Sequence, residues 1–237
     1  MPRPLKRIEY SADGVALTGY LAAPDGTGQV PGVIIAHEAM GMNEHVKGRA
    51  EALAALGYMA FAIDLYGAAD LSLEEAREKS AELMRTPGLL KQRAGAGFAT
   101  FAALPRVATN RLAAIGFCQG GSTVLELART GVPLLAVVGF HPGYHRPAGS
   151  VDRPISAKVL MMSGDADPVV SEEDRSAFIR EMRDSKADWQ LHLFGGVGHS
   201  YTNPRVDAYG FPGFAYDMLA DRRSWQLMQS LLAEVFA

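Results

Sequence analysis

Cysteine is almost absent from this chain of 237 residues, which contains only Cys118. A single cysteine forms no internal disulfide, so we expect a fold held by its core in a cytoplasmic setting. No apolar run approaches the ~18 residues that a membrane-spanning helix needs, and no apolar stretch typical of a signal peptide follows the basic segment 1–7. Clusters of Lys and Arg that fit a nucleic-acid backbone are missing too. We therefore expect neither a membrane nor a nucleic acid as a partner.

The remaining composition is that of an ordinary globular protein. Hydrophobic residues make up 48% of the chain, charged residues 21%, and the net charge is only −3. The length suits one domain of the larger α/β kind, and we find no linker, internal repeat or low-complexity segment. We therefore expect a single domain over residues 1–237, as a monomer or a homodimer.

Short apolar runs alternate with helical patterns from residue 30 onward. This alternation predicts a mostly parallel central sheet with helices on both faces. The Asp13-Gly14 pair between two short apolar stretches predicts an antiparallel hairpin at the start. The expected buried strands are 30–36, 58–64, 112–115, 134–140, 158–163 and 189–194, and the expected helices are 43–56, 72–85, 89–104, 122–128, 171–184 and 217–236.

One turn, Gly116-Phe117-Cys118-Gln119-Gly120-Gly121, joins an apolar run to a helix. A strand, a Gly-x-nucleophile-x-Gly turn and a helix form the nucleophile elbow of α/β-hydrolases. Here the central residue is cysteine instead of the usual serine. The N-terminus of the helix and a neighbouring histidine favour its thiolate form. The competing interpretation is a buried, inert cysteine.

Two further turns supply partners for Cys118 in chain order. Asp167 follows the run 158–163, and His199 follows the run 189–194. Nucleophile, acid and base in this order are typical of the α/β-hydrolase triad. His199 is expected to exchange the proton, and Asp167 to orient the imidazole. Asp165 is the alternative candidate for the acid. His45, His145 and His192 are poor candidates for the base, because they lie on a helix, far along a loop and within a strand.

These turns resemble those of the dienelactone hydrolase family, which has the α/β-hydrolase fold. The similarity covers nearly the whole chain and implies a Cys-His-Asp triad that hydrolyses esters or lactones without a metal or another cofactor. The motifs that carry it are His37-Glu38 with Gly41 and Asn43, Asp64-Leu65-Tyr66-Gly67, the turn 116–121, Gly164-Asp165-Ala166-Asp167 with Val170, and Gly198-His199-Ser200-Tyr201.

Two backbone N–H groups are needed to stabilise the oxyanion of the intermediate. We expect one from Gln119, which follows the nucleophile, and one from Ala39, in the loop after the first buried strand. Glu38 precedes Ala39, and the resemblance implies that its carboxylate contacts the thiol of Cys118. A carboxylate there opposes thiolate formation by like-charge repulsion, so we expect Glu38 to control the thiol; the alternative is a solvated loop carboxylate.

Substrate recognition is where the sequence departs from the family. Enzymes of the family that act on dienelactone hold its carboxylate with arginines, one of them four residues after the catalytic histidine. Asn203 occupies that position here, so we expect neutral esters or lactones, with activated phosphotriesters as a side activity. The segment 201–216 either rims the active site or forms a dimer contact. Candidate substrate contacts are Tyr66, Arg77, Phe117, His141, Tyr144 and Tyr201, although an aromatic residue at a strand end is as often simple core.

Two other classes of function remain open from the sequence. A reactive exposed cysteine suits a non-catalytic ligand-binding or redox-sensing protein on the same fold, but such a sensor needs no aspartate and histidine in register. A metallohydrolase is the third class, although the chain has no His-Glu-x-x-His spacing on a helix. Its metal ligands would be His37, Glu38, His141 and His145.

Overall fold

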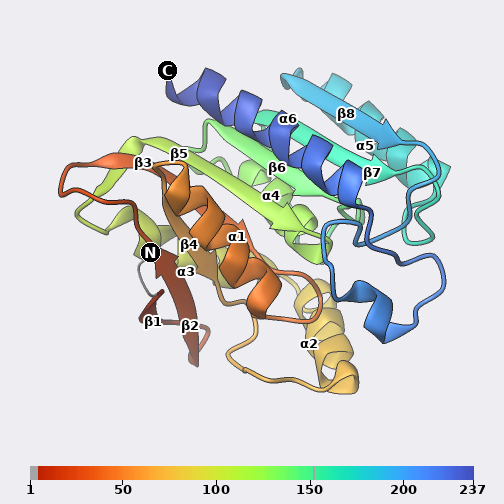
Figure 1. Ribbon diagram of the computed structural model, residues 1–237, viewed down its shortest axis with the longest axis horizontal. Helices are drawn as coiled ribbons and strands as arrows, with labels where there is room; N and C mark the ends of the chain where they lie inside the picture. Colours follow the sequence, from red (N-terminus) through yellow and green to blue (C-terminus); the bar gives the residue numbers. More distant parts are fainter. Residues whose placement is uncertain (1–4, 152) are drawn as a thin grey trace.

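The computed structural model describes residues 5–151 and 153–237, and within them one eight-stranded sheet runs through the molecule (Figure 1). The expectation about the basic segment 1–7 falls partly on residues 1–4, which lie outside the described residues. The order across the sheet is β1-β2-β4-β3-β5-β6-β7-β8. The strands are β1 (Lys6–Ala12), β2 (Val15–Ala22), β3 (Val30–Ala36), β4 (Met59–Ile63), β5 (Val107–Phe117), β6 (Ala136–Phe140), β7 (Lys158–Gly164) and β8 (Trp189–Phe194).

The sheet is mixed but mostly parallel, as the sequence predicts. β1 pairs antiparallel with β2, and β2 pairs antiparallel with β4, whereas all pairs from β4 to β8 are parallel. Asp13 and Gly14 connect β1 to β2 with φ values of +46° and +80°. Positive φ at both central residues is the geometry of a two-residue hairpin turn. The α/β-hydrolase architecture is therefore confirmed, including its N-terminal hairpin.

Helices cover both faces of the sheet and divide the core into two layers. Apolar residues of α1 and α6 pack with inward-facing strand residues on one face, and those of α2, α3, α4 and α5 pack on the other (Figure 1). Within the described residues, no helix combines the length and the hydropathy that crossing a membrane requires. The helices are α1 (Glu44–Ala55), α2 (Leu73–Arg85), α3 (Leu89–Ala102), α4 (Gln119–Arg129), α5 (Glu172–Asp184) and α6 (Met218–Phe236), with a short 3₁₀ helix η1 (Val206–Tyr209).

Four helices, α1, α2, α5 and α6, start at capping side chains, whereas α3 and α4 start without one. Ser72 and Ser171 each form a capping box at the start of α2 and α5. The sequence predicts a helix from Ser122, whereas α4 already begins at Gln119, directly after Cys118. The two glycines between them have low helix propensity, but close packing requires them. A Cβ on Gly120 would lie 2.1 Å from the carbonyl oxygen of Ala36.

The carboxyl ends of the parallel strands meet at one edge of the sheet, where open α/β sheets bind their ligands. The segment that follows β8, drawn in blue in Figure 1, carries η1 and extends toward α2 before α6 begins. Residues of this segment and of α2 line a common cavity. The fold therefore places the candidate site between the strand ends, α2 and η1.

Candidate active site

Cys118 lies in a strained turn between β5 and α4. Its φ of +52° is a backbone conformation that side chains rarely adopt, and its N–H donates to the carbonyl of Phe140 at 2.9 Å. The turn is too tight for any side chain at position 116, because a Cβ there would lie 1.9 Å from the carbonyl oxygen of Gly120. The thiol is free and half-buried. This is the geometry that presents a nucleophile above a sheet.

His199 and Asp167 meet beside this turn. Asp167 Oδ2 lies 2.7 Å from His199 Nδ1, and both side chains are fully buried. A carboxylate only accepts, so Nδ1 carries the proton and donates. His199 Nε2 is buried and makes no hydrogen bond of normal geometry within the described part of the chain. The structure thus brings Asp167 to His199, whereas the rival carboxylate Asp165 is exposed.

The charges around His199 favour its imidazolium form. Burial disfavours the charged ring, but the negative charge of Cys118 and the hydrogen bond to Asp167 outweigh it and raise the pKa of His199 to about 10. The negative charge of Cys118 is the largest of the raising effects, and the hydrogen bond to Asp167 follows it. The surroundings of His199 therefore favour its protonated form.

Cys118 and His199 open into one cavity of about 390 Å³. Its wall is largely apolar, and it combines the loop after β3, the start of α2 and the segment after β8. Arg77 of α2 lies over the ring of Phe211 at 5.1 Å and contributes a positive charge to the wall. The lining residues are Glu38, Ala39, Met40, Leu73, Arg77, Cys118, Val169, His199, Ser200, Asn203, Val206, Tyr209, Phe211, Pro212 and Phe214.

The aromatic segment 201–216 contributes three rings to this lining. Tyr209, Phe211 and Phe214 face the cavity, and the ring of Phe214 packs edge-on against His199 at 4.7 Å. Backbone hydrogen bonds of His199 to Gly213 and Ala215 hold the segment in place. Of the two predicted roles for this segment, the structure shows the first, a rim of the cavity.

Five of the six candidate substrate contacts do not line the cavity, and only Arg77 does. Phe117 is fully buried in a stack with Phe140. The hydroxyl of Tyr144 pairs with Ser163 at 2.9 Å. These aromatic side chains turn back into the core, because their ring surface packs better there than at a wet rim. The structure therefore places Tyr66, Phe117, His141, Tyr144 and Tyr201 outside the lining of this cavity, and their contact with substrate stays a prediction.

Tyr66 instead ties together the two predicted oxyanion residues. Its hydroxyl oxygen lies 3.0 Å from the carbonyl oxygen of Ala39 and 2.7 Å from Oε1 of Gln119, so its single proton is within reach of both acceptors. Gln119 is the first residue of α4, and the first N–H groups of a helix have no acceptor within it. Ala39 lines the cavity beside Cys118. The hydrogen bonds of Tyr66 thus fix the loop after β3 against the N-terminus of α4.

Glu38 contacts other residues than the Cys118 thiol that the resemblance implies. Its Oε2 accepts a hydrogen bond from Asn203 Nδ2 at 2.8 Å and lies 3.3 Å from Nδ1 of His45. Within the described residues, none of its hydrogen bonds goes to Cys118. Burial opposes ionisation of Glu38, but the hydrogen bond and charge of His45 and the Asn203 amide outweigh it and lower the pKa. The structure therefore places the Glu38 carboxylate against His45 and Asn203, and its control of the thiol stays a prediction.

The residues of the metallohydrolase alternative have other partners. His37 Nδ1 donates to the carbonyl of Glu38 at 2.7 Å, and its Nε2 accepts from the N–H of Leu65 at 3.2 Å. His145 is largely exposed, and its Nδ1 lies 3.5 Å from Asp174 Oδ1. Within the described residues, no three side chains of the kinds that ligate metals gather in one place. Both nitrogens of His37 are thus committed to the backbone.

His45 is the functional candidate that sequence reasoning missed. Its place on α1 argued against a role, yet its side chain is only 5% exposed and faces Glu38. The available signal was its position two residues after the cap Asn43, close in sequence to Glu38. That signal is weak, because histidines near helix starts are common on surfaces.

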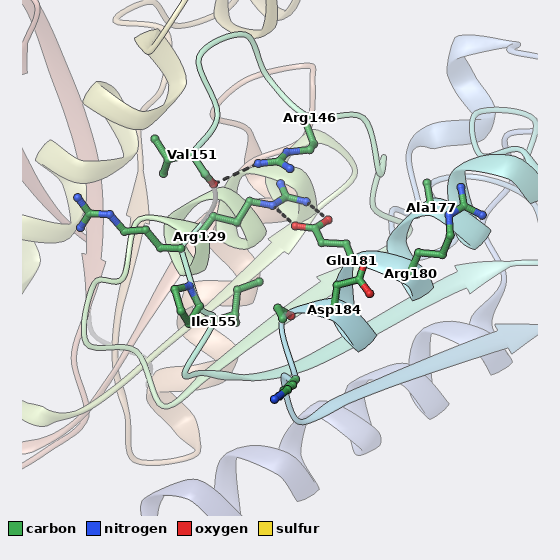
Figure 2. A pocket seen from close by; sticks show the side chains of 12 residues that line it. Arg129, Arg146, Val151, Ile155, Ala177, Arg180, Glu181 and Asp184 are labelled. Atoms are coloured by element: carbon green, nitrogen blue, oxygen red, sulfur yellow. Dashed lines mark hydrogen bonds and ion pairs between the residues drawn. The ribbon is translucent and has the colours of Figure 1, made fainter.

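A second cavity, of about 780 Å³, lies between the end of α4, residues of the stretches 146–151 and 153–155, and α5 (Figure 2). Its buried Arg129 forms a two-bond pair with Glu181 at 2.6 and 2.7 Å, and Arg146 donates to the carbonyl of Val151 (Figure 2). None of the candidate catalytic residues is among the described residues that line it. Cys118 and His199 line the smaller cavity at the strand ends instead.

Comparison with known proteins gives consistent matches over the whole fold. The family model "Dienelactone hydrolase family" matches residues 17–236. A probable 2-oxo-3-(5-oxofuran-2-ylidene)propanoate lactonase of Bradyrhizobium sp is 29% identical over 85% of this chain and 86% of its own length. The crystal structure of a dienelactone hydrolase-like promiscuous phosphotriesterase from metagenomic libraries is 35% identical, with a TM-score of 0.92 and 100% of both chains covered. The structure of m3DLH is 38% identical, with a TM-score of 0.92 and 99% of both chains covered.

Proposed function

The chain belongs to the dienelactone hydrolase family, a family of ester and lactone hydrolases, and we propose that its nucleophile is Cys118. The observation that carries the proposal is the position of His199, whose Nδ1 is held by Asp167 at 2.7 Å while the same ring lines the cavity with Cys118. In this proposal Cys118, His199 and Asp167 act as nucleophile, base and orienting acid. The substrates are neutral carboxylic esters or lactones.

The first half of the reaction forms an acyl-thioester. The thiolate of Cys118 attacks the carbonyl carbon, and the oxyanion accepts hydrogen bonds from the backbone N–H groups of Gln119 and Ala39. The bond to the leaving oxygen breaks as the tetrahedral intermediate collapses. The imidazolium of His199 donates its Nε2 proton to that oxygen, so an alcohol leaves, or the hydroxyl end of the opened lactone is formed.

The second half releases the acid and restores the ion pair. Neutral His199 takes a proton from water, and the resulting hydroxide attacks the thioester carbonyl. The carbon–sulfur bond breaks, the acid departs, and sulfur leaves as the thiolate beside the imidazolium. Asp167 keeps the Nδ1 proton in place throughout, so that Nε2 always faces the reacting atoms.

Covalent labelling of the thiol tests this proposal, because Cys118 is the only cysteine in the chain. We expect iodoacetamide to abolish hydrolysis of p-nitrophenyl acetate and of a simple lactone in proportion to the label bound. A chelator in a parallel sample is expected to leave turnover unchanged. Full turnover by fully labelled protein would point to the redox-sensing or ligand-binding alternative for Cys118, and loss with the chelator would point to a metallohydrolase.

We expect the cavity to prefer neutral substrates. Asn203 stands where an arginine would hold a carboxylate, and its amide is committed to the Glu38 carboxylate in the cavity wall. A substrate carboxylate placed there meets a like charge. We expect kcat/KM for p-nitrophenyl valerate to exceed that for mono-p-nitrophenyl glutarate by at least about tenfold, which corresponds to about 1.4 kcal/mol. Equal values would show that Arg77 serves as a carboxylate site.

Activated phosphotriesters form a second candidate substrate class. The observation that favours it is the 35% identity and the TM-score of 0.92 to the promiscuous phosphotriesterase. Thiolate attack at phosphorus develops an oxyanion that the same N–H groups of Gln119 and Ala39 accept. We expect slow hydrolysis of a p-nitrophenyl phosphotriester that disappears with iodoacetamide labelling, in parallel with esterase activity.

A further inference from the structure

The peptide that joins Glu38 to Ala39 carries one of the two N–H groups assigned to the oxyanion, and the side chain of His37 holds its other side. Nδ1 of His37 lies 2.7 Å from the carbonyl oxygen of Glu38. A carbonyl only accepts, so Nδ1 carries a proton and donates. The N–H of Gly41 donates to the same oxygen at 3.0 Å. Two donors from different parts of the loop therefore fix the direction of this carbonyl.

A second backbone contact fixes the tautomer of His37. Its Nε2 accepts from the N–H of Leu65, which lies just after β4, at 3.2 Å. Because an N–H group occupies Nε2, the proton of the neutral ring lies on Nδ1. Burial lowers the pKa of His37 and keeps the ring neutral, although the carbonyl of Glu38 and the charge of Asp64 act in the opposite direction. The imidazole thus has one donor, and that donor faces Glu38.

The surroundings of His37 hold its ring in one orientation. The side chain is fully buried, and the ring packs edge-on against Tyr66 with 4.7 Å between the ring centres. The hydroxyl oxygen of Tyr66 lies 3.0 Å from the carbonyl oxygen of Ala39, the next carbonyl along the loop. The start of α4 also packs closely here, since a Cβ on Gly120 would lie 2.8 Å from the carbonyl oxygen of His37. The donor at Nδ1 is therefore aimed by the fold.

The planarity of the peptide transmits this hold to the N–H of Ala39. In a trans peptide the C=O and N–H groups lie in one plane and point in opposite directions, and no peptide bond among the described residues is cis. The N–H of Ala39 therefore points away from the imidazole. Ala39 lines the cavity together with Cys118. Within the described part of the chain this N–H makes no hydrogen bond, so it is available to an oxygen in the cavity.

We propose that His37 is a positioning residue that orients the N–H of Ala39 toward the oxyanion of the tetrahedral intermediate. The inference rests on the proposed function, in which this N–H and that of Gln119 stabilise the oxyanion. A donor that is already oriented costs no reorganisation when negative charge develops on the substrate. Without the Nδ1 bond, only the N–H of Gly41 holds the Glu38 carbonyl, and the peptide rotates more freely. His37 therefore acts on the transition state and leaves the thiol itself unchanged.

The test compares His37→Phe with His37→Asn, whose side-chain amide keeps a donor near the position of Nδ1. Both variants leave the N–H of Leu65 without its acceptor, so they differ only in the donor to Glu38. We expect kcat and kcat/KM for p-nitrophenyl acetate to fall equally in His37→Phe, by about 10-fold to 100-fold, because complete loss of an oxyanion donor costs about 10²–10³-fold. His37→Asn is expected to recover most of this loss.

Alkylation of Cys118 separates this role from general damage to the site. Iodoacetamide reacts at a saturated carbon and forms no oxyanion, so its rate reports on the thiol alone. We expect the alkylation rate of His37→Phe to stay within about twofold of wild type, because the thiol keeps its surroundings. A merely structural role would lower both rates together. The matched control is His192→Phe on β8, outside the described residues that line the cavity, which keeps both rates.

Ala39→Pro removes the N–H that His37 is proposed to orient. Ala39 is the second residue of the turn closed by the bond from Gly41 to Glu38, and proline is favoured at that position. We expect this variant to lower kcat by about 10²-fold. Adding His37→Phe to it should cause no further loss, because no donor is left to orient.

Three results would overturn the proposal: wild-type kcat in His37→Phe, an alkylation rate that falls as far as kcat, or a full additional loss in the Ala39→Pro background. If labelling of Cys118 abolishes wild-type turnover while His37→Phe keeps its kcat, the proposed function stands and only this inference fails. Turnover by fully labelled wild type refutes the proposed function itself. Circular dichroism checks folding, and His37→Ala replaces His37→Phe if the larger ring prevents it.

Discussion

Cys118→Ala is expected to lower kcat for p-nitrophenyl acetate by about 10⁵-fold, to the level set by binding and the oxyanion N–H groups alone. Alanine removes the sulfur but fits the elbow, which already places a residue with a Cβ at φ of +52°. The fold should therefore persist, and the loss should be chemical. The measurement is initial-rate kinetics at saturating substrate, with circular dichroism as a check of folding.

The control for this variant is a serine that also lines the cavity. Ser200 lines the cavity beside His199 and also has a positive φ, of +54°. If Ser200 were the nucleophile, Ser200→Ala would lose activity and Cys118→Ala would retain it. Our account predicts the reverse order of losses. Comparable turnover in Cys118→Ala and wild type would exclude the thiol mechanism altogether.

Asp167→Asn is expected to lower kcat by about 10⁴-fold with little change in KM. An amide in place of the carboxylate donates to His199 Nδ1 and leaves the ring proton on Nε2, where it cannot accept a proton from water. The substitution also removes the carboxylate that helps to raise the pKa of His199 to about 10, although the charge of Cys118 contributes more. Stopped assays with a sensitive fluorogenic ester measure the residual rate.

The matched control is Asp165→Asn, two residues earlier in the same turn. Asp165 is exposed, whereas Asp167 is buried against His199. We expect Asp165→Asn to retain turnover close to that of wild type. A large loss in this variant, with activity retained in Asp167→Asn, would reverse the assignment of the acid. Thermal unfolding of both variants shows whether the loss of the buried Asp167–His199 pair also destabilises the fold.

Local signals in the sequence account for most of the fold. The capping serines at 72 and 171, the Asp13-Gly14 turn and the apolar run 30–36 each fix an element within a few residues, because each pattern satisfies backbone groups locally. The start of α4 at Gln119 escaped this reasoning. Its two glycines look like a loop in sequence, and only their close packing against β3 and β6 explains a helix there.

The candidate site could be predicted for the residues that directly follow strands. Cys118, Asp167 and His199 each follow a strand, so the topology alone brings them to one edge. The direction of a side chain at that edge is a different matter. Tyr201 donates to the carbonyl of Met162 in the core instead of reaching the cavity, and nothing in its sequence neighbourhood distinguishes the two outcomes.

The partners of Glu38 could not be predicted because neither contact follows from a local sequence pattern. Asn203 lies 165 residues further along the chain, and His45 reaches Glu38 only because α1 packs beside the loop after β3. Pattern rules of the kind used for strands and helices describe neighbours within a few residues. Contacts of this type depend on how whole elements pack, and here they change the interpretation of Glu38.

The central claim is covalent catalysis by Cys118, and trapping the intermediate tests it most directly. Wild-type protein is mixed with p-nitrophenyl acetate, quenched with acid within the first turnover, digested and examined by mass spectrometry. Our account predicts an acetyl group on the peptide that contains Cys118. Hydroxylamine at neutral pH removes this group, as it removes a thioester, and the group is absent from a variant that lacks His199. An acetyl group on any other residue of the active protein, with Cys118 unmodified, would contradict it.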